Sequence, residues 1–338
     1  MPLRVLLVTD ALLPPARGNG TTVARWIEGL ERRGVHVEVV EPDCEPRRAH
    51  DFDVVHGYHA ERCGPWCVEL AARFGIPSIV SLGGTDLWSL EDGTDRLGRG
   101  ALARCDLVTG AFASFGPRAA RVSGVPRPYA VVRRGVFLDP DPWLERDRDR
   151  LEIALPAGLR RVKDPLFAIE RFAKLVRAGL AARLRIVGSA LEDEYAARVR
   201  DAARGVPGVE IGARPPVAMG AVYSRAHVVW NTSLHEGGAN AVLEAAALGC
   251  VPYLRDVPGN RDLAAERDSP VALFATEDDD LIAFHRELLV ESAAARTARQ
   301  IATAAWLVRS HDPGDEIDDL LRAYARVIES RPGGPRSP

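Results

Sequence analysis

One stretch of the sequence, residues 228–262, constrains the fold more than any other. It begins with a short β-prone apolar segment, passes through a loop that contains Gly237 and Gly238, and enters a strong helix former over 241–248. A glycine follows this helical segment, as is common where helices end. A second apolar segment covers 251–254, so the stretch predicts a strand, a loop, a helix and another strand.

The loop and the start of this helix favour a phosphate group. Free backbone N–H groups after a Gly-Gly turn point at one spot, and the helix dipole adds partial positive charge there. Glu236, which precedes the glycines, would repel a phosphate and is better suited to accept hydrogen bonds from sugar hydroxyls. Glu244, two turns into the helix, could reach a second set of hydroxyls. The stretch therefore predicts a nucleotide-sugar site, with an ordinary loop and two solvated glutamates as the alternative.

Length and composition bound the answer further. The chain has 338 residues, which predicts two domains. A net charge of -3 gives no support for nucleic acid or an anionic membrane as a partner. Five cysteines at irregular spacing predict a reduced chain in the cytoplasm. We also expect no signal peptide and no membrane span.

The first half of the sequence alternates strand and helix patterns. Apolar residues over 5–9, a helical period over 23–33 and an apolar run over 35–40 predict a right-handed βαβ unit. Because ligands of open parallel sheets bind at the carboxyl ends of strands, we expect His59 and Asp86 to face a ligand. Asp86 could equally be the N-cap of the next helix.

The second half opens with a strand over 153–156 and a basic loop. Arg160 and Lys163 lie in this loop, shortly before Pro165, which can open a helix at its first turn. Two cations at a strand end could neutralise a diphosphate leaving group without a metal ion. A solvated basic loop is the alternative.

Short motifs along the chain together resemble a known family. The spacing from Glu236 to Glu244 is similar to that of retaining GT-B glycosyltransferases of the family 4-like type, the glycosyl transferases group 1. The resemblance is closest to the branch of the selenosugar synthases and the glycosyltransferase 1 domain-containing proteins. Five motifs carry it: Gly18-Asn19 with Thr22, Gly84-Thr85-Asp86, Leu159-Arg160 with Val162 to Pro165, Glu236 to Asn240 with Glu244, and Pro258-Gly259-Asn260.

The resemblance implies an α/β fold of the GT-B type, with two Rossmann-like domains that face each other across a cleft. We expect an N-terminal acceptor domain over 1–138, a linker over 139–150 and a C-terminal nucleotide-sugar donor domain over 151–305. Helices over 306–330 should follow, the last of them crossing back to the N-terminal domain.

The resemblance also implies roles for residues in the matching motifs. The implied catalytic residues are His59, Asp86 and Glu236. The residues implied for the sugar donor come from three motifs: Gly18, Asn19, Arg160, Lys163, Glu236, Gly237, Gly238, Ala239, Asn240 and Glu244. The residues implied for the acceptor are Thr22, Arg25 and Arg62, of which both arginines could instead lie on the surface at helix starts. No residue is expected to bind a metal.

The implied activity is that of a retaining glycosyltransferase that moves a sugar from UDP-N-acetylglucosamine or a UDP-hexose to a small acceptor. A selenophosphate or thio-type acceptor, as in selenosugar synthases, is one expectation, and a hydroxyl acceptor of secondary metabolism or glycoconjugate synthesis is another. A nucleotide-sugar epimerase of the same fold and a non-catalytic nucleotide-sugar-binding module stay open. We expect no cofactor and only small-molecule partners, and the sequence indicates no oligomeric state.

Overall fold

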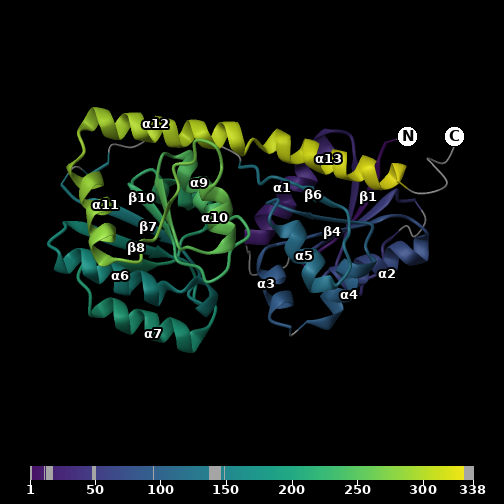
Figure 1. The fold of residues 1–338 in the computed structure, drawn as a ribbon, viewed down its shortest axis with the longest axis horizontal. Helices are drawn as coiled ribbons and strands as arrows, with labels where there is room; N and C mark the ends of the chain where they lie inside the picture. The colour runs from purple at the N-terminus through teal and green to yellow at the C-terminus, as the bar shows by residue number, and fades with distance from the viewer. Residues whose placement is uncertain are drawn as a thin grey trace. The chain divides into compact units, whose positions relative to one another are not determined.

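The computed structural model describes residues 2–10, 12, 18–47, 51–93, 95–136, 146–147 and 149–330. The chain divides into two compact units, Met1–Gly135 with His311–Pro338 as the first and Val136–Ser310 as the second. The chain thus leaves the first unit once and returns to it for its final helix (Figure 1). Most of the expected linker, 139–150, lies outside the described residues.

The first unit is built on a parallel six-stranded sheet in the order β2-β1-β3-β4-β5-β6. Several strands are buried along their whole length, as continuous apolar runs predict for a parallel sheet. Because β1 lies between β2 and β3, the strand order reverses beside it. The strands are β1 (Arg4–Val8), β2 (His36–Val40), β3 (Val54–Tyr58), β4 (Ser78–Ser81), β5 (Leu107–Gly110) and β6 (Tyr129–Val131).

Helices flank this sheet. Right-handed crossovers in opposite directions put α1 on one face and α2, α4 and α5 on the other (Figure 1). The helices of the first unit are α1 (Gly18–Arg32), α2 (Gly64–Phe74), α3 (Thr85–Glu91), α4 (Arg96–Arg104), α5 (Phe115–Ser123) and α13 (Pro313–Glu329).

The C-terminal helix α13 belongs to the core of the first unit and packs beside α1 (Figure 1). Ile317 and Tyr324 of α13 are buried in the same apolar cluster as Trp26. The ring of His56 stacks on Trp26, and its Nδ1 lies 2.9 Å from the Tyr324 hydroxyl. The other ring nitrogen of His56 lies 2.7 Å from Oγ of Ser81. A buried polar chain therefore joins α13 to the sheet.

The second unit is built on another parallel six-stranded sheet, in the order β12-β11-β10-β7-β8-β9. Its core is mostly aliphatic and contains an aromatic cluster, in which the indole of Trp230 packs on Phe274 and donates to Nε2 of His285 at 3.0 Å. The strands are β7 (Leu151–Pro156), β8 (Ala182–Val187), β9 (Val209–Gly212), β10 (Val228–Asn231), β11 (Val251–Leu254) and β12 (Ala272–Leu273).

Helices again connect these strands. Helices α6 and α7 pack together on β8 and β9, and α12 packs on α9. The α/β class and the two Rossmann-like units expected from the sequence are confirmed by these two sheets with their flanking helices. The helices are η1 (Arg161–Lys163), α6 (Pro165–Arg177), α7 (Asp193–Arg204), η2 (Pro216–Ala218), α8 (Met219–Tyr223), α9 (Asn240–Ala247), α10 (Pro258–Ala264), α11 (Asp278–Val290) and α12 (Ala293–Ser310).

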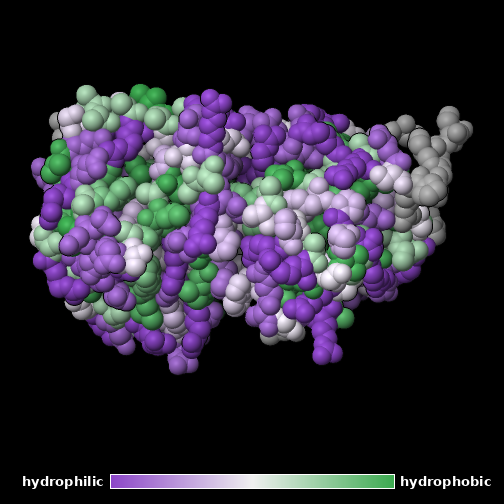
Figure 2. Space-filling model, viewed as in Figure 1, coloured by the Kyte–Doolittle hydropathy of each residue, from purple (hydrophilic) through white to green (hydrophobic). Residues whose placement is uncertain are grey.

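The surface is mostly hydrophilic on the face that Figure 2 shows, with hydrophobic side chains in small separate areas. This distribution fits a chain in which 27% of the residues are charged. None of the described helices is both long enough and apolar enough to cross a membrane.

The buried His56 makes the first unit sensitive to acid. Burial lowers the pKa of His56 to about 3, whereas an unfolded histidine titrates near 6.5. Between these two pH values the unfolded state binds the extra proton, so stability falls as pH falls, by up to about 1.4 kcal/mol per pH unit.

We predict that His56→Gln, although less stable at pH 7, loses less stability than the wild type from pH 6.5 to pH 4. Urea unfolding at several pH values measures this, and parallel curves would contradict it.

Candidate functional site

The strand order of the second unit marks one place for a ligand. The chain runs from β7 outward to β8 and β9 and then returns to the other side of β7 with β10. Ligands of open α/β sheets bind at such a reversal, outside the carboxyl ends of the two strands. The loop after β7 carries Arg160 and Lys163, and the loop after β10 carries Glu236. The fold therefore brings two predicted parts of the site to one edge of the sheet.

Lys163 and Glu236 form an ion pair at this edge. Nζ of Lys163 lies 2.5 Å from Oε1 of Glu236, and Nδ2 of Asn231 donates to the same oxygen at 3.0 Å. The Glu236 side chain is 7% exposed and that of Lys163 is 23% exposed. Burial alone would raise the pKa of Glu236, but the positive charge of Lys163 and the neighbouring hydrogen bonds lower it. Glu236 is therefore a carboxylate at neutral pH.

Two further hydrogen bonds to backbone carbonyl oxygens hold the two loops together. Oγ1 of Thr232 donates to the carbonyl oxygen of Lys163 at 2.9 Å. The N–H of Leu234 donates to the carbonyl oxygen of Val162, also at 2.9 Å. The loops themselves therefore set the distance between Lys163 and Glu236.

The glycine loop continues from Glu236 to the start of α9. Gly238 has a φ of 95°, a left-handed conformation that favours glycine. Helix α9 begins at Asn240, so the N–H groups of its first turn lie at the end of this loop. Gly259 of α10 packs closely against the loop: a Cβ at this position would lie 2.2 Å from the carbonyl oxygen of Glu236. This close approach explains the glycine in the Pro258-Gly259-Asn260 motif.

The remaining sugar-donor candidates of the second unit lie close in sequence to Lys163 or to Glu236. Arg160 is half-buried just before η1, Ala239 is the N-cap residue of α9, and Glu244 is half-buried on α9. Arg161 differs from them, since its side chain is 67% exposed and lies 4.0 Å from the carboxylate of Glu192. The second unit thus carries the predicted cations, carboxylates and helix start on the strand-end loops and the helix that follows.

In the first unit, His59 occupies a tight turn at the carboxyl end of β3. Its φ is 88°, which is uncommon for a residue other than glycine, and its side chain is buried. The N–H of Arg62 donates to Nδ1 of His59 at 3.4 Å, so the neutral ring carries its proton on Nε2. Burial lowers the pKa of His59. The ring is therefore neutral at pH 7 and offers one N–H donor.

Asp86 is fully buried in the first turn of α3. Burial alone would raise the pKa of Asp86, but His59, whose Nδ1 is 4.0 Å away, and backbone donors lower it. The N-cap residue of α3 is Gly84, so the alternative that Asp86 is the N-cap is wrong. Backbone hydrogen bonds occupy both oxygens of the Asp86 carboxylate and hold the loops before α3. The carboxylate accepts four backbone N–H groups, from Gly83 at 2.9 Å and from Gly84, Leu87 and Ala60 at 2.8 Å each.

The side chains of Asn19 and His59 meet over Gly83. A Cβ at Gly83 would lie 3.4 Å from Cδ2 of His59 and 3.5 Å from Nδ2 of Asn19. Gly18 is the first residue of α1, directly before Asn19. The first unit therefore brings the start of α1 and the loops at the carboxyl ends of β3 and β4 together in one cluster.

Arg25, predicted to bind the acceptor, is a structural residue instead. It is 5% exposed, and its guanidinium forms two hydrogen bonds with Glu316 of α13, one of them from Nη2 to Oε1 at 2.9 Å. The indole of Trp26 donates to the same oxygen at 2.7 Å. A buried guanidinium paired in this way is not available to a ligand. The structure therefore argues against an acceptor role for Arg25, because helix α13 packs beside α1 and its Glu316 pairs with this arginine.

The other two acceptor candidates are also engaged. Thr22 is buried, and its Oγ1 accepts a hydrogen bond from Nη1 of Arg134 at 2.5 Å. Arg62 is 27% exposed and pairs with Asp10, with Nη1 2.6 Å from Oδ2. The two arginines among the acceptor candidates, Arg25 and Arg62, thus both have their positive charge paired with a carboxylate.

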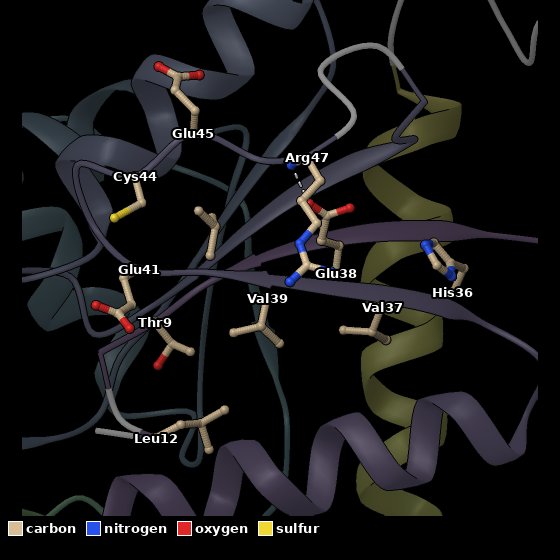
Figure 3. Close-up of a pocket in the computed structure, with 11 residues that line it drawn as sticks. Thr9, Leu12, His36, Val37, Glu38, Val39, Glu41, Cys44, Glu45 and Arg47 are labelled. Carbon is tan, nitrogen blue, oxygen red and sulfur yellow. Dashed lines mark hydrogen bonds between the residues drawn. The ribbon is translucent and has the colours of Figure 1, made fainter. Parts of the chain in front are cut away.

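A separate groove of about 760 Å³ runs along the edge strand β2 (Figure 3). Its lining includes Val37 and Val39 of the strand and the carboxylates of Glu38, Glu41 and Glu45. No residue of the predicted site lines this groove. Among the described residues, no group of three or more His, Cys, Asp or Glu is placed to hold a metal ion.

The sequence analysis did not identify Arg255 or its ion pair with Asp164. Arg255 follows β11 directly and pairs with Asp164, the residue after Lys163, at 2.7 Å. Its place at the carboxyl end of a strand next to β10 was the available signal, by the same rule that selected His59.

Comparison with known proteins agrees with the geometry of the second unit. Residues 152–291 match the family model described as "Glycosyl transferases group 1". A relative in Xenopus tropicalis, glycosyltransferase 1 domain-containing protein 1, is 33% identical over 138 residues, which are 40% of this chain and 39% of that protein. The match thus spans about two fifths of the relative's length.

Solved structures share the fold over nearly the whole chain. Anabaena HepE in complex with UDP and glucose matches with a TM-score of 0.77 at 14% identity, over 96% of this chain and 99% of that chain. Sucrose-phosphate synthase from Thermosynechococcus elongatus matches with a TM-score of 0.76 at 13% identity, over 97% and 100%. The chain therefore has the GT-B fold seen in these structures, and most of its second unit matches the group 1 family model.

The structural role of Arg25 is testable through its partner. We predict that Glu316→Gln lowers the free energy of unfolding by about 3 kcal/mol, because it leaves a buried guanidinium without a carboxylate. Asp318→Asn in the same helix is the control, since it breaks the exposed pair with Arg33 and should cost less than about 1 kcal/mol. Urea unfolding measures both. Equal stability of the two variants, with an altered acceptor KM for Arg25→Gln, would restore the acceptor role.

Proposed function

We propose that this chain is a retaining glycosyltransferase that uses a nucleotide sugar and binds its diphosphate in the second unit. The observation that carries the proposal is the ion pair between Lys163 and Glu236 at the strand reversal. The matched group 1 domain, which covers both residues, supports it.

The two residues of the ion pair would bind different parts of the nucleotide sugar. An ammonium group has three N–H donors, so Lys163 can keep one bond to Glu236 and give others to phosphate oxygens. Glu236 accepts hydrogen bonds only, and the bonds from Lys163 and Asn231 leave lone pairs for sugar hydroxyls. In this proposal Lys163 binds the diphosphate and Glu236 binds the transferred sugar.

Three further parts complete the proposed donor site. Arg160 adds a second positive charge from the same loop as Lys163. The N–H groups between Gly237 and Asn240, at the start of α9, add hydrogen-bond donors and the positive end of the helix dipole. Glu244 on α9 would accept hydrogen bonds from the ribose hydroxyls.

In the proposed reaction, the bond between the anomeric carbon and the leaving phosphate oxygen breaks while the acceptor oxygen attacks from the same face of the sugar. The departing phosphate takes the acceptor's proton, so the protein supplies no base and forms no covalent intermediate. Its contribution is to position the reactants and to stabilise the charge that develops on the diphosphate. Lys163, Arg160 and the start of α9 would supply that stabilisation without a divalent cation.

The charges of the first unit favour a neutral hydroxyl acceptor over a small anion. A selenophosphate acceptor would need cationic side chains in the acceptor unit. Arg25 is neutralised by Glu316, and Arg62 is paired with Asp10. His59, with its neutral ring, suits a hydroxyl group instead. UDP sugars are the first donors to test, since Anabaena HepE was solved with UDP-glucose.

A donor and acceptor screen tests the proposal. We expect the protein, supplied with UDP-glucose or UDP-N-acetylglucosamine in EDTA, to release UDP and to form a glycoside of a hydroxyl acceptor with the anomeric configuration of the donor. Mass spectrometry and NMR identify the product. Product with selenophosphate alone would overturn the hydroxyl proposal, and a changed sugar nucleotide without acceptor would indicate an epimerase. UDP binding without any turnover would indicate a binding module.

The two lysines of the sequence, Lys163 and Lys174, supply a matched pair of variants. Lys163→Ala should lower turnover on the order of 100-fold, as is typical when one preorganised electrostatic donor is lost. Lys174 is 20% exposed and pairs with Asp278 at 2.7 Å, away from the proposed site, so Lys174→Ala should keep normal turnover. Equal activity of the two variants would contradict the assignment of Lys163.

A further inference from the structure

Arg255 is fixed at the carboxyl end of β11 by its own backbone. Its N–H donates to the carbonyl oxygen of Asn231 at 2.6 Å, and its carbonyl oxygen accepts from Nδ2 of Asn260 at 2.8 Å. Asn260 is fully buried, so this second contact lies inside the unit. The Cα of Arg255 is therefore held firmly, and the reach of its side chain is limited.

The side chain of Arg255 connects its own loop, after β11, with the loops after β7 and β10. Nη1 lies 2.7 Å from Oδ2 of Asp164, in the loop after β7. The same nitrogen donates to the carbonyl oxygen of Thr232, in the loop after β10, at 3.1 Å. The guanidinium also lies over the ring of Phe167, 4.4 Å from its centroid. One side chain thus binds the loops that carry Lys163 and Glu236.

Asp164, which pairs with Arg255, is the neighbour of Lys163 in the chain and is itself held in place. It has a φ of 44°, a left-handed conformation that is uncommon outside glycine, although aspartate adopts it more often than most residues. Its carboxylate accepts from the N–H of Phe167 at 3.4 Å, which caps α6, and from the hydroxyl of Tyr195 at 3.2 Å. A residue in this conformation keeps it only where its surroundings require it. Asp164 follows Lys163 directly and is the C-cap residue of η1, so the contacts that hold Asp164 also hold the end of η1 that carries Lys163.

We propose that Arg255 is a positioning residue for the sugar donor. Through Asp164 and Thr232 it holds the loop after β7 against the loop after β10, so that Nζ of Lys163 stays within reach of both Glu236 and the diphosphate. This inference rests on the proposed function. An arginine suits the role because its planar guanidinium donates in fixed directions while its face packs on an aromatic ring, which a lysine ammonium cannot reproduce.

The chain offers a matched control for this inference. Arg261 pairs with Asp256 on the surface nearby, with side chains 62% and 46% exposed. Arg261→Ala removes an arginine and an ion pair close to β11 without touching the loops of the donor site. Arg255→Ala and Arg255→Lys are the test variants, and the second keeps the charge while it removes the planar group.

The test combines donor kinetics with amide hydrogen exchange. For Arg255→Ala we expect the donor KM for UDP-glucose and the Kd for UDP to rise on the order of 10-fold or more, with the acceptor KM unchanged. Amides of residues 160–164 and 232–236 should exchange faster than in the wild type. Arg255→Lys should recover only part of the loss, and Arg261→Ala should match the wild type in every measurement.

The outcomes separate this inference from the proposed function. A wild type that neither binds UDP nor uses UDP-glucose would overturn both. A wild type that binds UDP, with an Arg255→Ala variant whose donor KM and loop exchange are unchanged, would overturn the role of Arg255 alone. A variant with a lower melting temperature but unchanged donor KM would also overturn it, because that is the result of a purely structural residue.

Discussion

The ion pair between Lys163 and Glu236 is the contact on which the candidate site depends. A carboxylate that is 7% exposed has lost most of its hydration, and only charge and hydrogen bonds can offset that loss. Lys163 supplies the charge and Asn231 a further bond. Buried ion pairs add little net stability compared with apolar packing, so stability alone gives a weak reason to keep one here. Its place at the reversal of strand order gives a functional reason.

Contacts around the ion pair hold the two loops that carry it in place. Thr232 and Leu234 bind the loop after β7, while Gly259 lets α10 approach the backbone of Glu236 closely. Residues from the ends of three neighbouring strands thus fix one lysine and one glutamate. The first unit does the same for His59, whose turn is tied to α3 through the carboxylate of Asp86. In both units, strained or buried residues sit at strand ends, where a GT-B fold has its loops free for ligands.

Much of this could be predicted from the sequence, because the signals are local. The alternation of strands and helices gave the two parallel sheets, and the position of Lys163 and Glu236 just after strands placed them at one edge. Contacts between distant residues were beyond such reasoning. Arg25 and Glu316 are 291 positions apart. The sequence of α1 alone does not show whether water or α13 covers the face that carries Arg25. Arg255 and Asp164, 91 positions apart, pair only because β11 lies beside β10 in the folded sheet.

The most direct test of the central claim, that Lys163 binds the diphosphate of a nucleotide sugar, is amine labelling read by peptide mass spectrometry. Lys163 and Lys174 are the two lysines of the sequence, and their side chains are similarly exposed, at 23% and 20%. Saturating UDP should slow the labelling of Lys163 several-fold and leave Lys174 unchanged, whereas uridine, which lacks the phosphates, should protect neither. Labelling of Lys163 at the same rate with and without UDP would contradict the account.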